Sequence, residues 1–112
     1  MTMTTRRTIT LTELASKLEA RTPLVLLEAL PEHHYRKEHL PTARNLPHDQ
    51  VERLAAALIP AKTTEVVVYC ASATCRNSDT AATALARLGY DDVRVFSGGK
   101  QEWAAAGLPF EA

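Results

Sequence analysis

The stretch VVVYCASATCRNSDTAATALARLGY, residues 66–90, contains both cysteines of the chain. Its first residues are a short run of branched apolar side chains, which is typical of a strand covered on both faces. From Ser78 to Leu88, alanine and leucine recur at the spacing of one helix face, and Gly89 marks the end of that helix. The stretch therefore predicts a buried strand, a short loop that begins at Cys70, and a helix.

The rest of the chain continues this alternation of strands and helices. Short apolar runs predict further strands at 24–28, 43–46 and 93–96. Helices are expected at 11–20 with Thr10 or Thr12 as its cap, at 31–39 where Pro31 opens the helix, at 49–59 with Asp49 as its cap, and at 100–106. The order predicts an α/β fold, with a mainly parallel central sheet of about five strands and helices on both faces. In such sheets, sites form where strands lead into helices, and residues 70–78 are such a place.

Length and composition exclude several classes of protein. At 112 residues the chain is expected to form one domain, 1–112. Thirteen basic and thirteen acidic residues leave no net charge, so no nucleic acid partner is implied. No apolar run reaches signal-peptide or membrane-spanning length, which predicts a cytoplasmic protein with no membrane partner. In that reducing compartment, two cysteines indicate catalysis, redox chemistry or simple burial and not a structural disulfide.

Cys70 stands where a thiol can be activated. A thiol becomes a nucleophile as the thiolate, which backbone N–H groups and the positive end of a helix dipole stabilise. The small residues of ASATCRN allow the backbone to curl around the sulfur, and Arg76 adds a positive charge, so an anion could bind beside the thiolate. The alternative from the residues alone is that Cys70 is a small buried apolar side chain.

Several motifs resemble the rhodanese-like domain family. After the cysteine and its helix, the family has a Gly-aromatic pair, a strand, a Gly-Gly, a Trp and a Gly-x-Pro. The matching residues here are Gly89-Tyr90, Val93, Gly98-Gly99, Trp103 and Gly107-Leu108-Pro109. In the first half, EHLPTARNLP is similar to the family's Gly-His-Ile-Pro-Gly-Ala-x-Asn-Ile-Pro, through His39, Leu40, Pro41, Ala43, Asn45, Leu46 and Pro47.

The resemblance implies a sulfurtransferase without a cofactor. Cys70 would take sulfane sulfur from a small anion such as thiosulfate, carry it as a persulfide, and pass it to a thiol or protein acceptor. The N–H groups of the loop would bind the anionic sulfur. The implied substrate-binding residues are Ala71, Ser72, Ala73, Thr74, Cys75 and Arg76.

The loop departs from the family pattern, because it is about two residues longer than usual. Cys70 and Arg76 match the Cys-x5-Arg of phosphatases and arsenate reductases related to rhodanese, although Tyr69 replaces the His that usually precedes their Cys. That chemistry stays open as an alternative. A non-catalytic binding module, or a redox sensor that uses Cys70 and Cys75 as a pair, is the other.

Three further features bear on the site. Cys75 falls on the usual Arg position of the short loop, and is either a resolving thiol that attacks sulfur on Cys70 or a simple loop residue. Glu28 and Leu30 occupy the places of the family's Asp-x-Arg, so the acid is kept and the Arg is absent. The histidines lack the spacing of a metal site, and we expect none. Trp103 is expected to anchor the last helix in the core.

Overall fold

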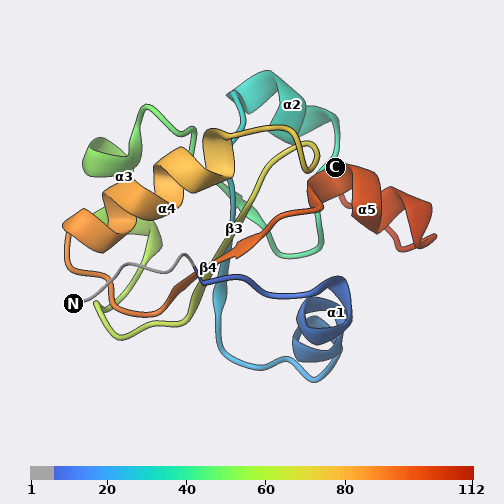
Figure 1. The fold of residues 1–112 in the computed structure, drawn as a ribbon, viewed down its shortest axis with the longest axis horizontal. Helices are drawn as coiled ribbons and strands as arrows, with labels where there is room; N and C mark the ends of the chain where they lie inside the picture. Colours follow the sequence, from blue (N-terminus) through green and yellow to red (C-terminus); the bar gives the residue numbers. More distant parts are fainter. Residues whose placement is uncertain (1–6) are drawn as a thin grey trace.

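The structure is a computed structural model that describes residues 7–112. The chain start, where we expect no signal peptide, lies mainly outside this range. Within it, four strands form one parallel sheet in the order β2-β1-β3-β4 (Figure 1). Their bounds are β1 (Val25–Glu28), β2 (Arg44–Asn45), β3 (Val66–Tyr69) and β4 (Val93–Phe96).

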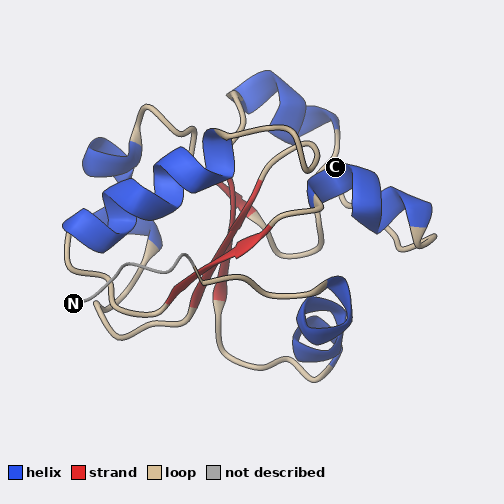
Figure 2. Ribbon diagram, in the orientation of Figure 1, coloured by secondary structure: helices blue, strands red, loops and turns tan. Residues whose placement is uncertain are grey.

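Helices cover both faces of this sheet, as Figure 2 shows. They are α1 (Leu11–Glu19), α2 (Glu32–Lys37), α3 (Val51–Leu58), α4 (Asn77–Arg87) and α5 (Gly99–Ala105). Helices α3 and α4 pack on one face and α1 and α5 on the other, which gives the molecule two apolar layers. The α/β fold with helices on both faces is therefore confirmed.

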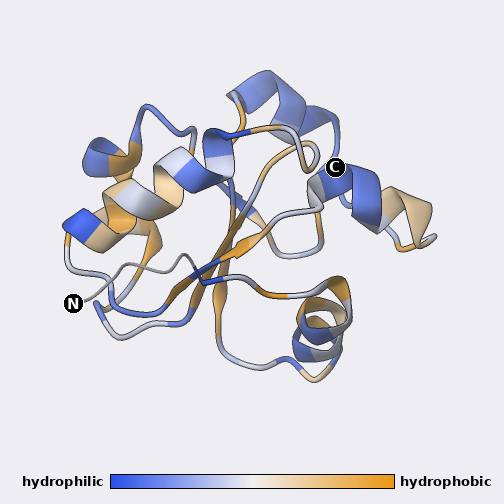
Figure 3. Cartoon of the chain, in the orientation of Figure 1, coloured by the Kyte–Doolittle hydropathy of each residue, from blue (hydrophilic) through white to orange (hydrophobic). Residues whose placement is uncertain are grey.

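Strand β3 contributes side chains to both apolar layers. All four of its residues are buried. Val66 and Val68 pack toward α3 and α4, whereas Val67 and Tyr69 pack toward α1 and α5. This alternation follows from the period of a strand, and it explains why the run VVVY is apolar throughout. Figure 3 shows the same distribution, with hydrophobic strands inside and hydrophilic residues on the outer sides of the helices.

The sheet has four named strands where the sequence predicts about five, and the difference lies at the edge beside β4. Thr8 pairs with Val95 through a single parallel bridge, so the chain that leads into α1 extends the four-stranded sheet without forming a named strand. Backbone bonds join Ile9 N to Val95 O and Val95 N to Arg7 O, each at 3.0 Å. This segment shields the edge of β4.

Two helix starts show which of the expected caps form. Thr10 caps α1, and its hydroxyl and the Glu13 carboxylate bond each other's backbone N–H groups. The predicted cap Asp49 of α3 is wrong, since α3 begins at Val51 and Gln50 occupies the cap position. The reason is a turn in which Gln50 N donates to Pro47 O at 2.9 Å, which places Asp49 one residue too early.

No helix within residues 7–112 is both long enough and apolar enough to cross a membrane.

Candidate active site

Cys70 directly follows β3, at the carboxyl edge of the sheet, and is 1% exposed. Its Sγ lies 3.3 Å from the carbonyl oxygen of Cys75 and 3.9 Å from that of Ser72. It also lies 3.5 Å from the hydroxyl of Ser78 in the first turn of α4. The loop 70–76 thus brings the sulfur to the start of a helix, as the sequence predicts.

The groups that face the Cys70 sulfur differ from the expected ring of N–H donors. Burial, together with the hydrogen bond to Cys75, raises the pKa of the Cys70 thiol, and the contacts with Ser78 oppose this only in part. Carbonyl oxygens accept a proton from a thiol and repel a thiolate. In this loop conformation Cys70 is therefore stabilised as the neutral thiol, because the peptides of Ser72 and Cys75 turn their oxygens toward it.

Cys75 has the more favourable surroundings for a thiolate. Partial burial opposes its ionisation, but hydrogen bonds from the Cys70 thiol and from the N–H groups of Ala71 and Asn77 outweigh this and lower the pKa of Cys75. Both cysteines are free thiols. The loop therefore brings the two thiols close enough to shift each other's pKa, and it directs the N–H groups of Ala71 and Asn77 to Cys75.

This difference predicts which thiol reacts first with an alkylating reagent. Because the thiolate is the nucleophile, iodoacetamide at neutral pH should modify Cys75 before Cys70. Modification of Cys70 should accelerate about tenfold per pH unit below its raised pKa, since one proton must leave. Mass spectrometry of peptides after timed acid quenching measures both rates, and preferential labelling of Cys70 at neutral pH would contradict the arrangement.

A pocket of about 240 Å³ opens next to Cys75. It lies between the loop, the start of α4 and the end of β4, and its walls include Cys75, Arg76, Ser78, Asp79, Val95 and Ser97. Cys70 lies behind Ser78, which lines the pocket and also contacts the Cys70 sulfur. A small anion in the pocket would meet Cys75 first.

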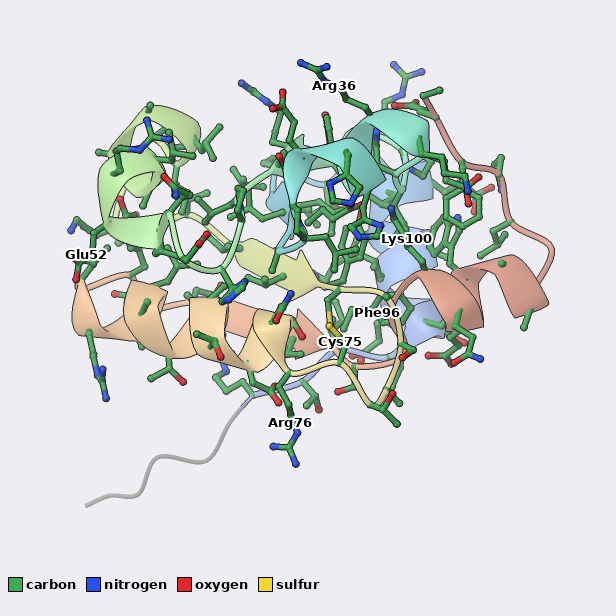
Figure 4. The ribbon with its side chains drawn as sticks, turned by 90° about the horizontal axis from the view of Figure 1, so that it is seen from above. Arg36, Glu52, Cys75, Arg76, Phe96 and Lys100 are labelled. Atoms are coloured by element: carbon green, nitrogen blue, oxygen red, sulfur yellow. The ribbon has the colours of Figure 1, made fainter. Side chains whose placement is uncertain are left out.

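The other predicted binding residues lie along the outside of the loop. Ala71, Ala73 and Thr74 are exposed, and Ser72 is half-buried, with its hydroxyl 3.1 Å from that of Thr74. Arg76 is exposed, and its side chain projects outward from the molecule, away from Cys75 (Figure 4). The structure thus brings Cys70 and Cys75 together and leaves the Arg76 guanidinium outside.

A buried charged network lies beside the loop. Glu28, at the end of β1, is 0% exposed, and its Oε1 accepts a 2.6 Å hydrogen bond from the Tyr69 hydroxyl. Its Oε2 lies 3.0 Å from the Lys100 ammonium, which also donates to His34 O at 3.0 Å. The Tyr69 hydroxyl accepts from Leu40 N, and burial, followed by the nearby Glu28 charge, raises the Tyr69 pKa. A buried carboxylate needs such partners.

The first turn of α5 is tied directly to the cysteine loop. Lys100 N donates to Cys70 O at 3.0 Å, and Gln101 N donates to Ala71 O at 2.9 Å. These bonds satisfy two helix N–H groups that have no partner within α5. The same helix therefore holds the backbone of Cys70 and supplies the cation for Glu28.

The sequence matches the family model of the rhodanese-like domain over residues 10–106. The chain belongs to the rhodanese-like domain family. No curated protein gives a sequence match to it. In this rhodanese-like chain, Cys70 occupies the strand end and Ser78 lies in the first turn of the helix that follows, as the family pattern implies.

Solved structures share the fold. The BH2092 protein from Bacillus halodurans superposes with a TM-score of 0.88, covering 95% of this chain and 77% of that one, at 20% identity. The Alr3790 protein from Anabaena gives 0.83, covering 93% and 80%, at 24% identity. The thiosulfate sulfurtransferase from Pseudomonas aeruginosa gives 0.82 at 24% identity, and the match covers 95% of this chain and 20% of that one. At these identities the likeness establishes the fold alone.

Two contributors to this rhodanese-like site are missing from the sequence prediction. Ser78 is predicted only as a helix start, although a hydroxyl at that position can reach a sulfur at the preceding strand end. Lys100 carries no local signal, because its partner Glu28 lies far away in the sequence. Glu28 in an otherwise apolar strand is the signal that could have predicted this contact, because a buried carboxylate needs a cation from another segment of the chain.

The aromatic and histidine predictions concern packing. Trp103 is buried, meets Phe96 edge-on and donates from Nε1 to Pro109 O at 2.8 Å, which confirms it as a core anchor. His39 is buried and stacks on Tyr35 with ring centroids 4.0 Å apart. Across residues 7–112 no cluster of three potential metal ligands forms.

Proposed function

We propose that this chain is a sulfurtransferase that carries sulfane sulfur as a persulfide on Cys70. The observation that carries the proposal is a free cysteine at the carboxyl end of the central strand of a rhodanese-like domain, 3.5 Å from the hydroxyl of Ser78. The substrate class is a small anion with a sulfane sulfur, such as thiosulfate, and the acceptor is a thiol. Its free thiols suit a reducing compartment such as the cytoplasm.

The reaction takes place in two displacements. The Cys70 thiolate attacks the outer sulfur of thiosulfate, a new S–S bond forms, and sulfite leaves with the electron pair of the old one. An acceptor thiolate then attacks the outer sulfur of the persulfide and releases Cys70 as the thiolate. Covalent catalysis of this kind divides one transfer into two easier steps.

The residues around Cys70 set the conditions for the first displacement. The Cys70 thiol must lose its proton, and burial disfavours this loss because it raises the pKa of Cys70. The hydroxyl of Ser78 is a neighbouring group that can donate a hydrogen bond to the resulting thiolate. The donor must also pass the loop, because Cys70 is 1% exposed. The small residues Ala71 and Ala73 offer little resistance to a movement that opens the pocket toward Cys70.

The substitution Cys70→Ser tests the proposal. Sulfur transfer from thiosulfate to a thiol acceptor should fall at least about a thousandfold, because no nucleophile remains to form the first S–S bond. Thr83→Ser, an exposed change on α4, serves as the control and should keep the rate. Mass spectrometry should find one added sulfur atom on Cys70 in the variant Cys75→Ser, in which Cys70 is the one remaining thiol of the sequence. If sulfur transfer survives in Cys70→Ser, or if no sulfane donor produces an adduct, the proposal fails.

The geometry gives less support to phosphate or arsenate chemistry. A Cys-x5-Arg site needs the guanidinium to face the anion bound at the cysteine. Arg76 is instead exposed, and its side chain projects away from Cys75 (Figure 4). We therefore favour sulfur transfer, with a non-catalytic module as the conclusion if no adduct forms.

A further inference from the structure

The two cysteines are placed as a reacting pair. Both are free, and each thiol shifts the pKa of the other. The Cys70 sulfur also lies 3.3 Å from the carbonyl oxygen of Cys75, so the loop folds back on itself between the two residues. A turn in which Cys75 N donates to Ser72 O at 3.1 Å holds this path. The second thiol therefore lies within reach of any sulfur carried on the first.

The pair is asymmetric with respect to the pocket. Cys75 forms part of the pocket wall, whereas Cys70 lies behind Ser78. The N–H groups of Ala71 and Asn77 are directed at the Cys75 sulfur. The backbone and hydroxyl of Ser78 donate to the Cys70 sulfur, but burial outweighs them, and two carbonyl oxygens also face that sulfur. The loop thus supports a thiolate on the pocket side and a neutral sulfur on the inner side.

We infer that Cys75 is a resolving nucleophile, which attacks the persulfide of Cys70, closes a Cys70–Cys75 disulfide and releases hydrosulfide into the pocket. This inference rests on the proposed function and sharpens it. The chain would then reduce sulfane sulfur to sulfide, with a small dithiol as the electron donor.

The atoms and electrons of this step balance. The Cys75 thiolate attacks Sγ of the Cys70 persulfide, the bond between Sγ and the outer sulfur breaks, and its electron pair leaves on the outer sulfur as hydrosulfide. The outer sulfur is reduced, and the two cysteine sulfurs are oxidised to the disulfide. A dithiol then supplies two electrons and two protons, restores both thiols and becomes a cyclic disulfide.

Chemical reactivity favours this direction of attack. Thiol–disulfide exchange needs a thiolate as the attacking group, and the lowered pKa of Cys75 increases its thiolate fraction above that of an ordinary cysteine. Burial raises the pKa of the Cys70 thiol, so Cys70 is disfavoured as the leaving thiolate. Attack on Sγ, with hydrosulfide leaving, avoids placing a negative charge on the buried Cys70.

The test compares the full-length wild type with Cys75→Ser. Each protein is reduced, freed of reductant, mixed with thiosulfate at neutral pH, quenched in acid and alkylated. The wild type should release about one sulfide per chain and contain a Cys70–Cys75 disulfide by peptide mass spectrometry. Cys75→Ser should keep the extra sulfur on Cys70 and release sulfide at least about tenfold more slowly. Added dithiothreitol should then give repeated turnover in the wild type.

Other outcomes overturn the inference in distinguishable ways. A wild type that keeps its Cys70 persulfide as long as Cys75→Ser does would remove the resolving role and leave the sulfurtransferase standing. An extra sulfur found on Cys75, without a disulfide, would show a relay between the thiols and also remove it. If Cys75→Ser is folded by circular dichroism and takes up no sulfur from any sulfane donor, both the sulfurtransferase and the resolving step are wrong.

Discussion

Replacing Lys100 by methionine is expected to lower the free energy of unfolding by about 3–5 kcal/mol, because it leaves the Glu28 carboxylate buried without its cation. Glu28 is 0% exposed and cannot turn to water. Methionine keeps the length and apolar stem of lysine, so the loss of charge is the main change. The melting temperature should fall by roughly 10–20 °C, and urea unfolding at neutral pH measures the free energy.

Two further variants separate charge from packing. Lys37→Met changes an exposed lysine at the end of α2 and should shift stability by less than about 0.5 kcal/mol. The double variant Glu28→Gln with Lys100→Met removes both charges of this ion pair, and should regain part of the lost stability. Equal stability of Lys100→Met and Lys37→Met would show that the ion pair contributes nothing.

Replacing Gly99 by alanine is expected to cost about 3 kcal/mol or more and to slow sulfur uptake by about a hundredfold. Gly99 has φ +59°, where a side chain is strained, and a Cβ there would overlap the carbonyl oxygen of Cys70 and lie 2.9 Å from its carbonyl carbon. The backbone at Gly99 or at Cys70 must therefore move to make room for the methyl group. Since that carbonyl belongs to Cys70, the proposed nucleophile, a shift of even about 1 Å would misplace the sulfur.

Gly107→Ala provides the matched control. Gly107 has φ +76°, but nothing lies within 4 Å of a Cβ built on it. It should show only the cost of left-handed backbone, about 1–2 kcal/mol, with sulfur uptake unchanged. Thermal melts and thiosulfate uptake measured on both variants separate the two effects. If Gly99→Ala behaves like Gly107→Ala in both measurements, close contact with Cys70 does not matter.

Local patterns in the sequence predicted the elements around the site well. The run VVVY and the alanine-rich segment after it became β3 and α4, because residue periodicity and Gly89 act over a few neighbouring residues. The position of Cys70 at the strand end follows from the same stretch. The Asp49 cap failed because a turn at Pro47 decided where α3 begins.

The sequence could not predict the electrostatics of the loop. Whether a peptide presents its N–H or its C=O to a sulfur depends on the path of the backbone, and residues as small as Ala73 and Ser72 permit either orientation. The structure turns carbonyls toward Cys70 and N–H groups toward Cys75, the reverse of the simple expectation. Arg76 likewise matches a motif by spacing alone, and its direction depends on the start of α4.

The sequence by itself determined the order of strands and helices and placed Cys70 at the end of the central strand, because both depend on interactions between near neighbours. Only the tertiary structure decided that Lys100 neutralises Glu28 and that Cys75 lies against Cys70 on the pocket side. The burial and the electrostatic environment of a side chain depend on groups from segments that are distant in the sequence and that the parallel sheet brings together. A local sequence pattern does not contain information about these distant groups.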